Sequence, residues 1–140
     1  MQPIKFRGKQ IDNGKWVYGY LIFMNNKIAY IADMGIVKFD DDEKIKKYIL
    51  NIEEPYNLGE IYKVIPETVG QFTECLDKNK KELYHNDIVK TWNKNISYIY
   101  YEKGYWRIGK RGRIIKEYEW ETFEKIGNVF DNPELLKKEN

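Results

Sequence analysis

The chain has 140 residues, a formal net charge of +2 at pH 7 and a single cysteine. This length fits one domain or two very small ones, and it allows a core that needs neither disulfides nor metal ions. Aromatic residues make up 16% of the chain and charged residues 33%, so it is too aromatic for a disordered protein and too polar for a membrane protein. Charges in residues 1–9, where a signal peptide would be apolar, favour the cytoplasm and no membrane partner.

The reactive side chains argue against common catalytic and metal sites. Cys75, His85 and Ser97 are the only cysteine, histidine and serine. One Cys and one His cannot build a zinc finger, and Ser97 lies in a strand-like segment instead of the sharp turn that carries a hydrolase nucleophile. We therefore expect no catalytic residue, no metal site and no cofactor. A pair of acids in a cleft stays open as an enzymatic alternative, since the 22 Asp and Glu residues offer many pairs.

The first forty residues predict a three-stranded β-meander. Residues 4–11 and 16–23 are rich in β-branched and aromatic side chains, and they flank the tight-turn sequence Asp12-Asn13-Gly14. Both faces of residues 16–23 are apolar, which predicts a central strand. An Asn-Asn pair then turns the chain into a third strand over residues 27–31.

The spacing of apolar residues changes over residues 41–54. Ile45, Tyr48, Ile49 and Ile52 follow the spacing i, i+3, i+4, i+7, which predicts an amphipathic helix of two to four turns. The acids before it would cap the helix and favour its positive end. This helix would separate an N-terminal sub-lobe, residues 1–40, from a barrel-like one, residues 61–131, within a single domain of residues 1–140.

The second half of the chain predicts short strands again. They cover residues 61–65, 68–73, 87–92, 96–101 and 105–108, with weaker strand patterns at 114–118 and 126–130 and a short helix at 132–138. Gly70 and Gly127 predict a bulge or a close neighbouring backbone. Asp87 heads a strand after a turn, as at the entry of SH3-like barrels, where the carboxylate binds nearby backbone N–H groups. The expected fold is mainly β: a β-meander plus an SH3-like small β-barrel, with one amphipathic helix between them and a short C-terminal helix.

Three stretches of the chain resemble one protein family. They are IKFRGK (4–9) with WVYGY (16–20), then IPETVGQFT (65–73) with DKNKKELY (77–84) and DIV (87–89), and finally IGNVFDNPELL (126–136). In order and spacing they resemble the YopX family, a group carried by phages and prophages of bacteria. The resemblance implies a mainly β protein encoded by a phage or prophage and located in the bacterial host cell. It implies no reaction, because the family has no established activity to carry over.

Two departures from the family pattern fall in turns. The family usually has Asn-Gly where this chain has Asn79-Lys80, and Glu-Gly where it has His85-Asn86. Asparagine tolerates the left-handed backbone best among residues other than glycine, so we expect Asn86 to keep it. Lysine tolerates it less, so we expect the turn at Lys80 to have changed type. A histidine in place of the usual glutamate also argues against a catalytic role for His85.

The strongest charge signal is a basic stretch over residues 103–116, which carries six cations and no acid. A hairpin tip at residues 109–112 would lift two charges clear of the surface, beside aromatic residues that can stack on bases. The candidate nucleic-acid or partner-binding residues are Lys103, Trp106, Arg107, Lys110, Arg111, Arg113 and Lys116. A solvated turn balanced by Glu117, Glu119 and Glu121 is one alternative interpretation. A contact between the tip and an acidic patch of a neighbouring subunit, such as residues 40–43, is another.

Two classes of function remain open. One is a non-catalytic phage or prophage accessory module that binds a macromolecule, which overlaps with a self-assembling structural protein. The other is an enzyme that uses carboxylates in a cleft. The shortage of His, Ser and Cys favours the binding module. The abundance of aromatic residues also predicts a homo-oligomer, because small β domains often cover spare aromatic faces by self-association. Nucleic acid and a host protein are the other partners left open.

Overall fold

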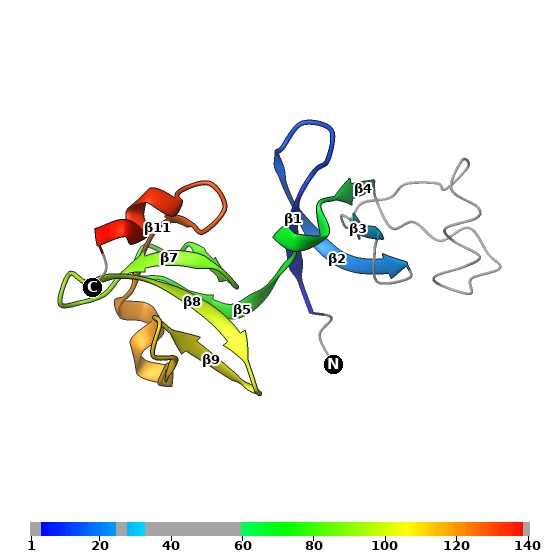
Figure 1. The fold of residues 1–140 in the computed structure, drawn as a ribbon. Coiled ribbons are helices and arrows are strands. Elements are labelled where there is room, and N and C mark those ends of the chain that lie inside the picture. The colour runs from blue at the N-terminus through cyan, green and yellow to red at the C-terminus, as the bar shows by residue number, and fades with distance from the viewer. Residues whose placement is uncertain (1–3, 25–27, 33–59, 139–140) are drawn as a thin grey trace. The chain divides into compact units, whose positions relative to one another are not determined.

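The computed structural model describes residues 4–24, 28–32 and 60–138 (Figure 1). These residues form eleven strands and three short 3-10 helices, which confirms the mainly β fold class. They divide into two compact units, residues 1–69 and 70–140. The amphipathic helix predicted over residues 41–54 lies outside the described residues. No helix in the described part of the chain is long and apolar enough to cross a membrane.

The N-terminal unit is an antiparallel sheet with the strand order β4-β3-β2-β1. Its strands are β1 (Phe6–Lys9), β2 (Trp16–Met24), β3 (Ile28–Ala32) and β4 (Ile61–Val64), followed by the 3-10 helix η2 (Pro66–Thr68). β1, β2 and β3 form the predicted meander, with β2 in the middle. Ala29, Ile31 and Val64 are fully buried at its centre. A Cβ at Gly8 would lie 2.9 Å from Val64 Cγ2, so glycine lets the strands pack there.

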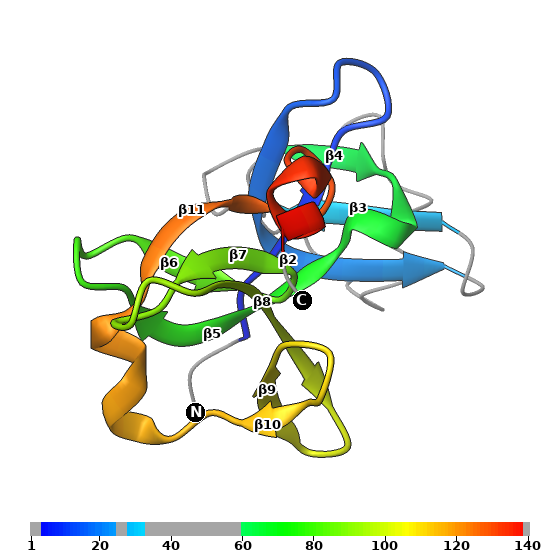
Figure 2. The same cartoon turned by 60° about the vertical axis from the view of Figure 1, so that its left-hand side comes forward.

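The C-terminal unit contains a two-stranded pair and a five-stranded antiparallel sheet with the order β10-β9-β8-β7-β11 (Figure 2). The pair is β5 (Gly70–Leu76) with β6 (Glu82–Tyr84); the sheet contains β7 (Asp87–Lys90), β8 (Ile96–Glu102), β9 (Tyr105–Ile108), β10 (Arg113–Ile114) and β11 (Glu124–Asn128). Among the described residues no strand pairing joins β10 to β11, so this sheet is open and the SH3-like barrel stays a prediction. The predicted C-terminal helix is the 3-10 helix η4 (Pro133–Lys138).

The core of the C-terminal unit lies between its strands and the 3-10 helix η3 (Glu117–Thr122), which connects β10 to β11. Its buried side chains are Leu83, Val89, Ile99, Ile108, Ile115, Trp120 and Phe123. The Trp120 ring meets the rings of Trp106 and Phe123 edge-on, with centroid distances of 6.1 and 5.9 Å. The strand predicted at 114–118 is therefore wrong beyond Ile114: the chain leaves β10 there and enters η3 at Glu117, which brings Trp120 onto the core.

Both turns that depart from the family pattern adopt the left-handed backbone. Asn86 has φ 71°, as predicted, but Lys80 has φ 65°, so the expected change of turn type is wrong. The reason lies in Asp77, whose Oδ1 accepts hydrogen bonds from the backbone N–H groups of Asn79 and Lys81 at 2.8 and 2.9 Å. These bonds fix the turn around Lys80 and outweigh the steric cost of its side chain.

The glycines predicted to mark close approaches do so. A Cβ at Gly70 would lie 2.9 Å from the His85 backbone oxygen, and one at Gly127 would collide with Asn132 Oδ1. The pairing of β11 with β7 also shifts register between Lys125 and Gly127, which is the predicted bulge.

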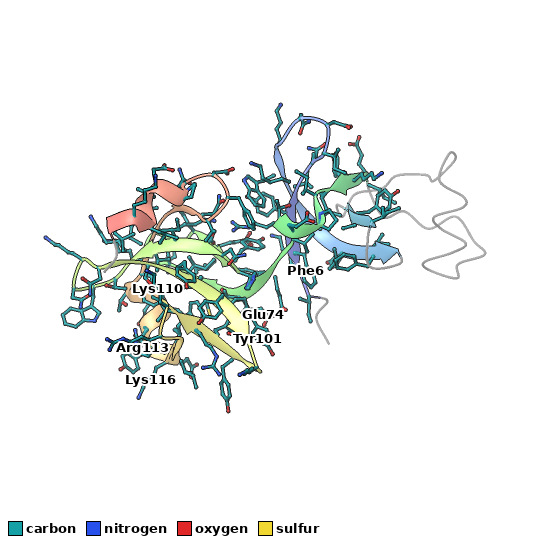
Figure 3. All side chains as sticks on the ribbon, in the orientation of Figure 1. Phe6, Glu74, Tyr101, Lys110, Arg113 and Lys116 are labelled. Carbon is teal, nitrogen blue, oxygen red and sulfur yellow. The ribbon has the colours of Figure 1, made fainter. Side chains whose placement is uncertain are left out.

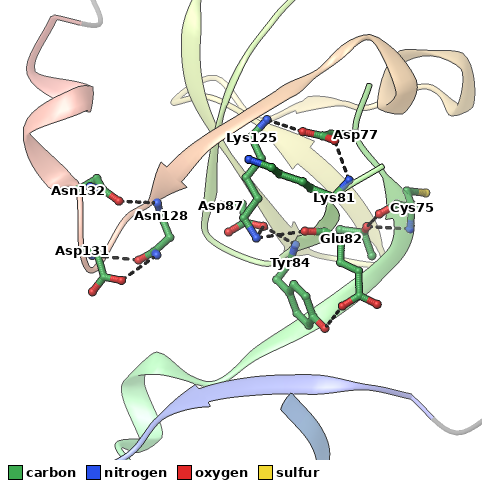
Figure 4. Close-up of polar contacts among 11 residues, drawn as sticks. Cys75, Asp77, Lys81, Glu82, Tyr84, Asp87, Lys125, Asn128, Asp131 and Asn132 are labelled. Carbon is green, nitrogen blue, oxygen red and sulfur yellow. Dashed lines mark hydrogen bonds and ion pairs between the residues drawn. The ribbon is translucent and has the colours of Figure 1, made fainter. Parts of the chain in front are cut away.

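Asp87 anchors the start of β7 as the sequence predicted (Figure 4). It is fully buried, and its Oδ2 accepts a hydrogen bond from the backbone N–H of Tyr84 at 2.6 Å. The Lys125 ammonium lies 3.3 Å from the same oxygen. The carboxylate therefore joins β6, β7 and β11.

Candidate nucleic-acid interface

The basic stretch folds as the predicted hairpin, with β9 and β10 as its strands and residues 109–112 as its tip. Gly109 and Gly112 have φ values of 77° and 67°, and the Gly112 N–H donates to the Gly109 carbonyl at 3.0 Å. A Cβ at Gly112 would also lie 2.8 Å from the Tyr100 hydroxyl. The two glycines close a tight turn that leaves Lys110 and Arg111 exposed between them.

Two arginines of the stretch bind the hairpin itself. Arg107 Nε donates to the Glu102 carbonyl at 3.1 Å, and its Nη1 donates to the Gly112 carbonyl at 3.0 Å. Arg113 Nη1 lies 2.9 Å from both carboxylate oxygens of Glu119 (Figure 3 labels Arg113). Arg107 thus fixes the base of the tip, and Arg113 ties the hairpin to η3.

The Arg113–Glu119 pair stays ionised at neutral pH. Burial by itself would raise the pKa of Glu119, but the hydrogen bonds from the Arg113 guanidinium and the Lys116 backbone N–H outweigh it, so the pKa lies below its usual value. The hydrogen bond to Glu119 raises the pKa of Arg113 in turn. Much of the Arg113 charge is therefore balanced inside the protein.

A groove of about 850 Å³ lies between the turn at residues 91–95 and the hairpin tip. The groove is lined by all five residues of the turn at 91–95 and by residues 109–111 and Arg113 of the hairpin. Ser97, Ile108 and Phe123 also line the groove, and because these three are buried they form its deeper part.

The groove is basic and carries an exposed aromatic ring. Its cations are Lys94, Lys110, Arg111 and Arg113, and its one acid is the Glu119 that Arg113 already binds. Within the described residues, Lys94, Lys110 and Arg111 make no ion pair, so their charges face solvent. Trp92, on the same groove, has 76% of its surface exposed.

The structure separates the predicted binding residues into two groups. Lys110, Arg111 and Arg113 line the groove, and Lys103, Trp106, Arg107 and Lys116 do not. Lys103 lies in the β8–β9 turn, at the end of β9 opposite the tip, because Glu102 pairs with Tyr105 and Ile99 with Ile108. Trp106 packs its ring against Tyr101, Trp120 and the core.

Sequence reasoning missed Trp92 and Lys94. The strand predicted over residues 87–92 ends at Lys90, and Trp92 lies in the following turn. Thr91 closes that turn: its N–H donates to the Asn95 carbonyl at 2.8 Å, and its carbonyl accepts from the Lys94 N–H at 2.8 Å. The available signal was the run Asn93-Lys94-Asn95, whose residue types favour turns over strands.

The only histidine and the only serine of the chain are held by contacts within the fold, and its only cysteine is partly buried. His85 Nδ1 accepts a hydrogen bond from the Tyr101 backbone N–H at 2.9 Å, and Ser97 is buried within β8. Burial, together with the nearby acids Glu117 and Glu74, raises the pKa of the Cys75 thiol. Among the residues that the structure describes, no group of three or more His, Cys, Asp or Glu side chains is placed to hold a metal ion.

The sequence was compared with protein-family models and with curated proteins, and a family model covers nearly the whole chain. No curated protein sequence matches it. The family model described as YopX protein matches residues 5–137, which include every residue of the groove. The chain therefore belongs to the YopX family.

Proposed function

We propose that this protein is a non-catalytic accessory module of a phage or prophage that binds nucleic acid through the groove between residues 91–95 and 109–113. The observation that carries the proposal is the convergence of Lys94, Lys110 and Arg111 on one groove without acidic partners among the described residues. The phage or prophage origin, and with it the bacterial cytoplasm as location, rests on the family resemblance alone.

The chemistry of the groove suits phosphates. Lysine offers a compact charge to a phosphate, and arginine offers a planar fork that binds two of its oxygens. Lys94 projects from one turn and Lys110 and Arg111 from another, so the cations sit on two separate turns of the same groove. A partner with charges repeated along its length can meet both turns at once, and a nucleic-acid backbone is such a partner.

The fixed contacts of the hairpin support this assignment. Arg107 and the two glycines hold the tip in one shape, and the Arg113–Glu119 pair holds the hairpin on η3. A preshaped tip loses less conformational entropy when a ligand immobilises it. We assign Arg107 and Arg113 to positioning the tip, and Lys94, Lys110 and Arg111 to contacting phosphates. The SH3-like barrel form of the C-terminal unit belongs to the same proposal, with the buried Asp87 at the head of β7 as its support.

The test is the salt dependence of oligonucleotide binding. The affinity of the whole chain for a short DNA or RNA should fall steeply with salt, because binding releases counterions from the phosphates. Changing Lys110→Ala and Arg111→Ala together should weaken binding and lower the slope of log K against log salt by about 1–2.

A matched control uses the same basic stretch. Lys103→Ala with Lys116→Ala removes the same charge from two exposed residues outside the groove, and it should leave affinity and slope nearly unchanged. Equal losses in the two double variants would locate binding elsewhere. No binding of single- or double-stranded DNA or RNA at low salt would remove the proposal.

A further inference from the structure

Trp92 is displayed on a rigid turn. Two backbone hydrogen bonds close the turn: one joins Thr91 to Asn95 and the other joins Thr91 to Lys94. The Asn95 N–H also donates to the Thr91 hydroxyl at 3.2 Å. The backbone beneath the ring is therefore fixed, while the ring itself is 76% exposed. Burial in the core therefore does not account for this ring, and its place on the basic groove leaves it available to a ligand.

The other described tryptophans have partners for their rings. Trp106 and Trp120 pack edge-on against each other, and the Arg7 guanidinium lies 4.5 Å from the ring centroid of Trp16. Within the described residues the indole of Trp92 packs on no aromatic ring and under no cation. With 76% of its surface exposed, the indole is accessible to a flat ligand.

The position of the ring relative to the cations selects the form of nucleic acid. Lys110 and Arg111 lie on a different turn of the same groove from Trp92, so a strand whose phosphates meet the tip can offer its bases to the indole. An indole stacks only on a base whose face is free, and the bases of a duplex already stack on one another. A duplex would use the cations and gain nothing from the ring.

We propose, as an extension of the function above, that the groove takes single-stranded nucleic acid and that Trp92 stacks on one of its bases. Stacking requires no particular base, because every base has a flat π-face, so the recognition is tolerant of sequence. Lys94, two residues away on the same turn, then contacts the phosphate next to the stacked base.

The experiment compares three probes at fixed salt: an eight-nucleotide thymidine strand, the same strand with every base removed, and a hairpin duplex. The wild-type chain should bind the thymidine strand most tightly. Trp92→Ala should weaken binding of the thymidine strand about five-fold or more and leave binding of the abasic strand unchanged. Trp92→Phe keeps an aromatic face and should restore most of the affinity.

Tyr118→Ala is the matched control, since this aromatic side chain is 68% exposed and lies outside the groove. It should change no affinity, and circular dichroism should show that all variants are folded. The inference is overturned if Trp92→Ala weakens both strands equally, or if the wild type prefers the duplex. In either case the loss of binding in the Lys110→Ala, Arg111→Ala variant would still support the groove itself, whereas a chain that binds none of the probes removes both proposals.

Discussion

Asp87 is a carboxylate that folding has taken out of water. An ionised group in such surroundings costs several kcal/mol unless donors replace its hydration. The Tyr84 backbone N–H and the Lys125 ammonium are two such donors, and Lys125 also donates to the Glu82 carbonyl at 3.1 Å. One charged pair thus holds three strands of the C-terminal unit together.

Replacing this carboxylate should therefore destabilise the whole C-terminal unit. We expect Asp87→Asn to lower the free energy of unfolding by about 2–3 kcal/mol, because a charge-assisted hydrogen bond is lost and Lys125 loses its counter-charge. Urea unfolding followed by tryptophan fluorescence measures the change. Glu121→Gln, on an exposed side chain of η3, should change the same quantity by less than about 0.5 kcal/mol. Equal effects of the two variants would contradict the structural role of Asp87.

Lys80 illustrates the opposite case, a residue that strains the backbone. Its φ of 65° is costly for any residue with a Cβ, and the Asp77 hydrogen bonds impose it. Lys80→Gly should raise the free energy of unfolding by about 0.5–1 kcal/mol, which thermal or urea unfolding would show. Lys78→Gly is the matched control: among the described residues Lys78 is not in the left-handed region, so glycine there should destabilise slightly. A loss of stability in Lys80→Gly would mean that the side chain makes a contact worth more than the strain.

At the scale of elements, the β5–β6 turn is bound to β11 through one side chain. Asp77 Oδ1 closes the turn, and its Oδ2 accepts the Lys125 backbone N–H at 2.8 Å (Figure 4). Burial alone would raise the pKa of Asp77, but the N–H groups of Lys125, Lys81 and Asn79 outweigh it and hold the pKa below the ordinary 3.8.

This lowered pKa makes stability depend on acid pH. A carboxylate whose pKa is lower in the folded state stabilises the fold above its unfolded pKa, and it loses that contribution as the pH falls through the folded value. Asp77→Asn should therefore be less stable than wild type by about 1–3 kcal/mol at pH 7, and the difference should shrink below about pH 4. Urea unfolding of the wild type and of Asp77→Asn between pH 7 and pH 2.5 measures this difference in the free energy of unfolding. A constant difference over that range would show that the carboxylate charge is not responsible.

The elements also show where sequence reasoning succeeds and where it stops. The meander, the β9–β10 hairpin and the Asp87 anchor follow from local signals: alternating apolar residues, glycines in turns and an acid at a strand start. Trp92 was missed because tryptophan favours strands, so its residue type extended the predicted strand past Lys90. The groove brings residues 91–95 close to residues 109–113. This proximity depends on the order of the strands in the sheet, which no local sequence pattern predicts.

At the scale of the whole molecule, the net charge of +2 conceals a local excess of positive charge at the groove. Three cations without acidic partners in the described residues share one groove, while acids such as Glu117 and Glu121 lie on η3 beside a separate hollow lined by Cys75, Leu76 and Tyr118. A uniform mixture of charges would bind polyanions weakly, whereas this separation leaves one surface positive. The distribution of charge over the surface is therefore a better guide to the chemistry of the partner than the net charge of the chain.

The last prediction concerns assembly. Exposed large apolar side chains occur on both units, among them Tyr18, Phe23, Leu76 and Tyr118. Covering such side chains by self-association releases water from apolar surface, so we expect a homo-oligomer whose mass by light scattering exceeds the 16.9 kDa of one chain at tens of micromolar. A monomer at those concentrations would contradict the prediction. The Lys110→Ala, Arg111→Ala variant should keep the wild-type mass if the groove binds nucleic acid as proposed. If the variant dissociates, the basic tip contacts a neighbouring subunit instead.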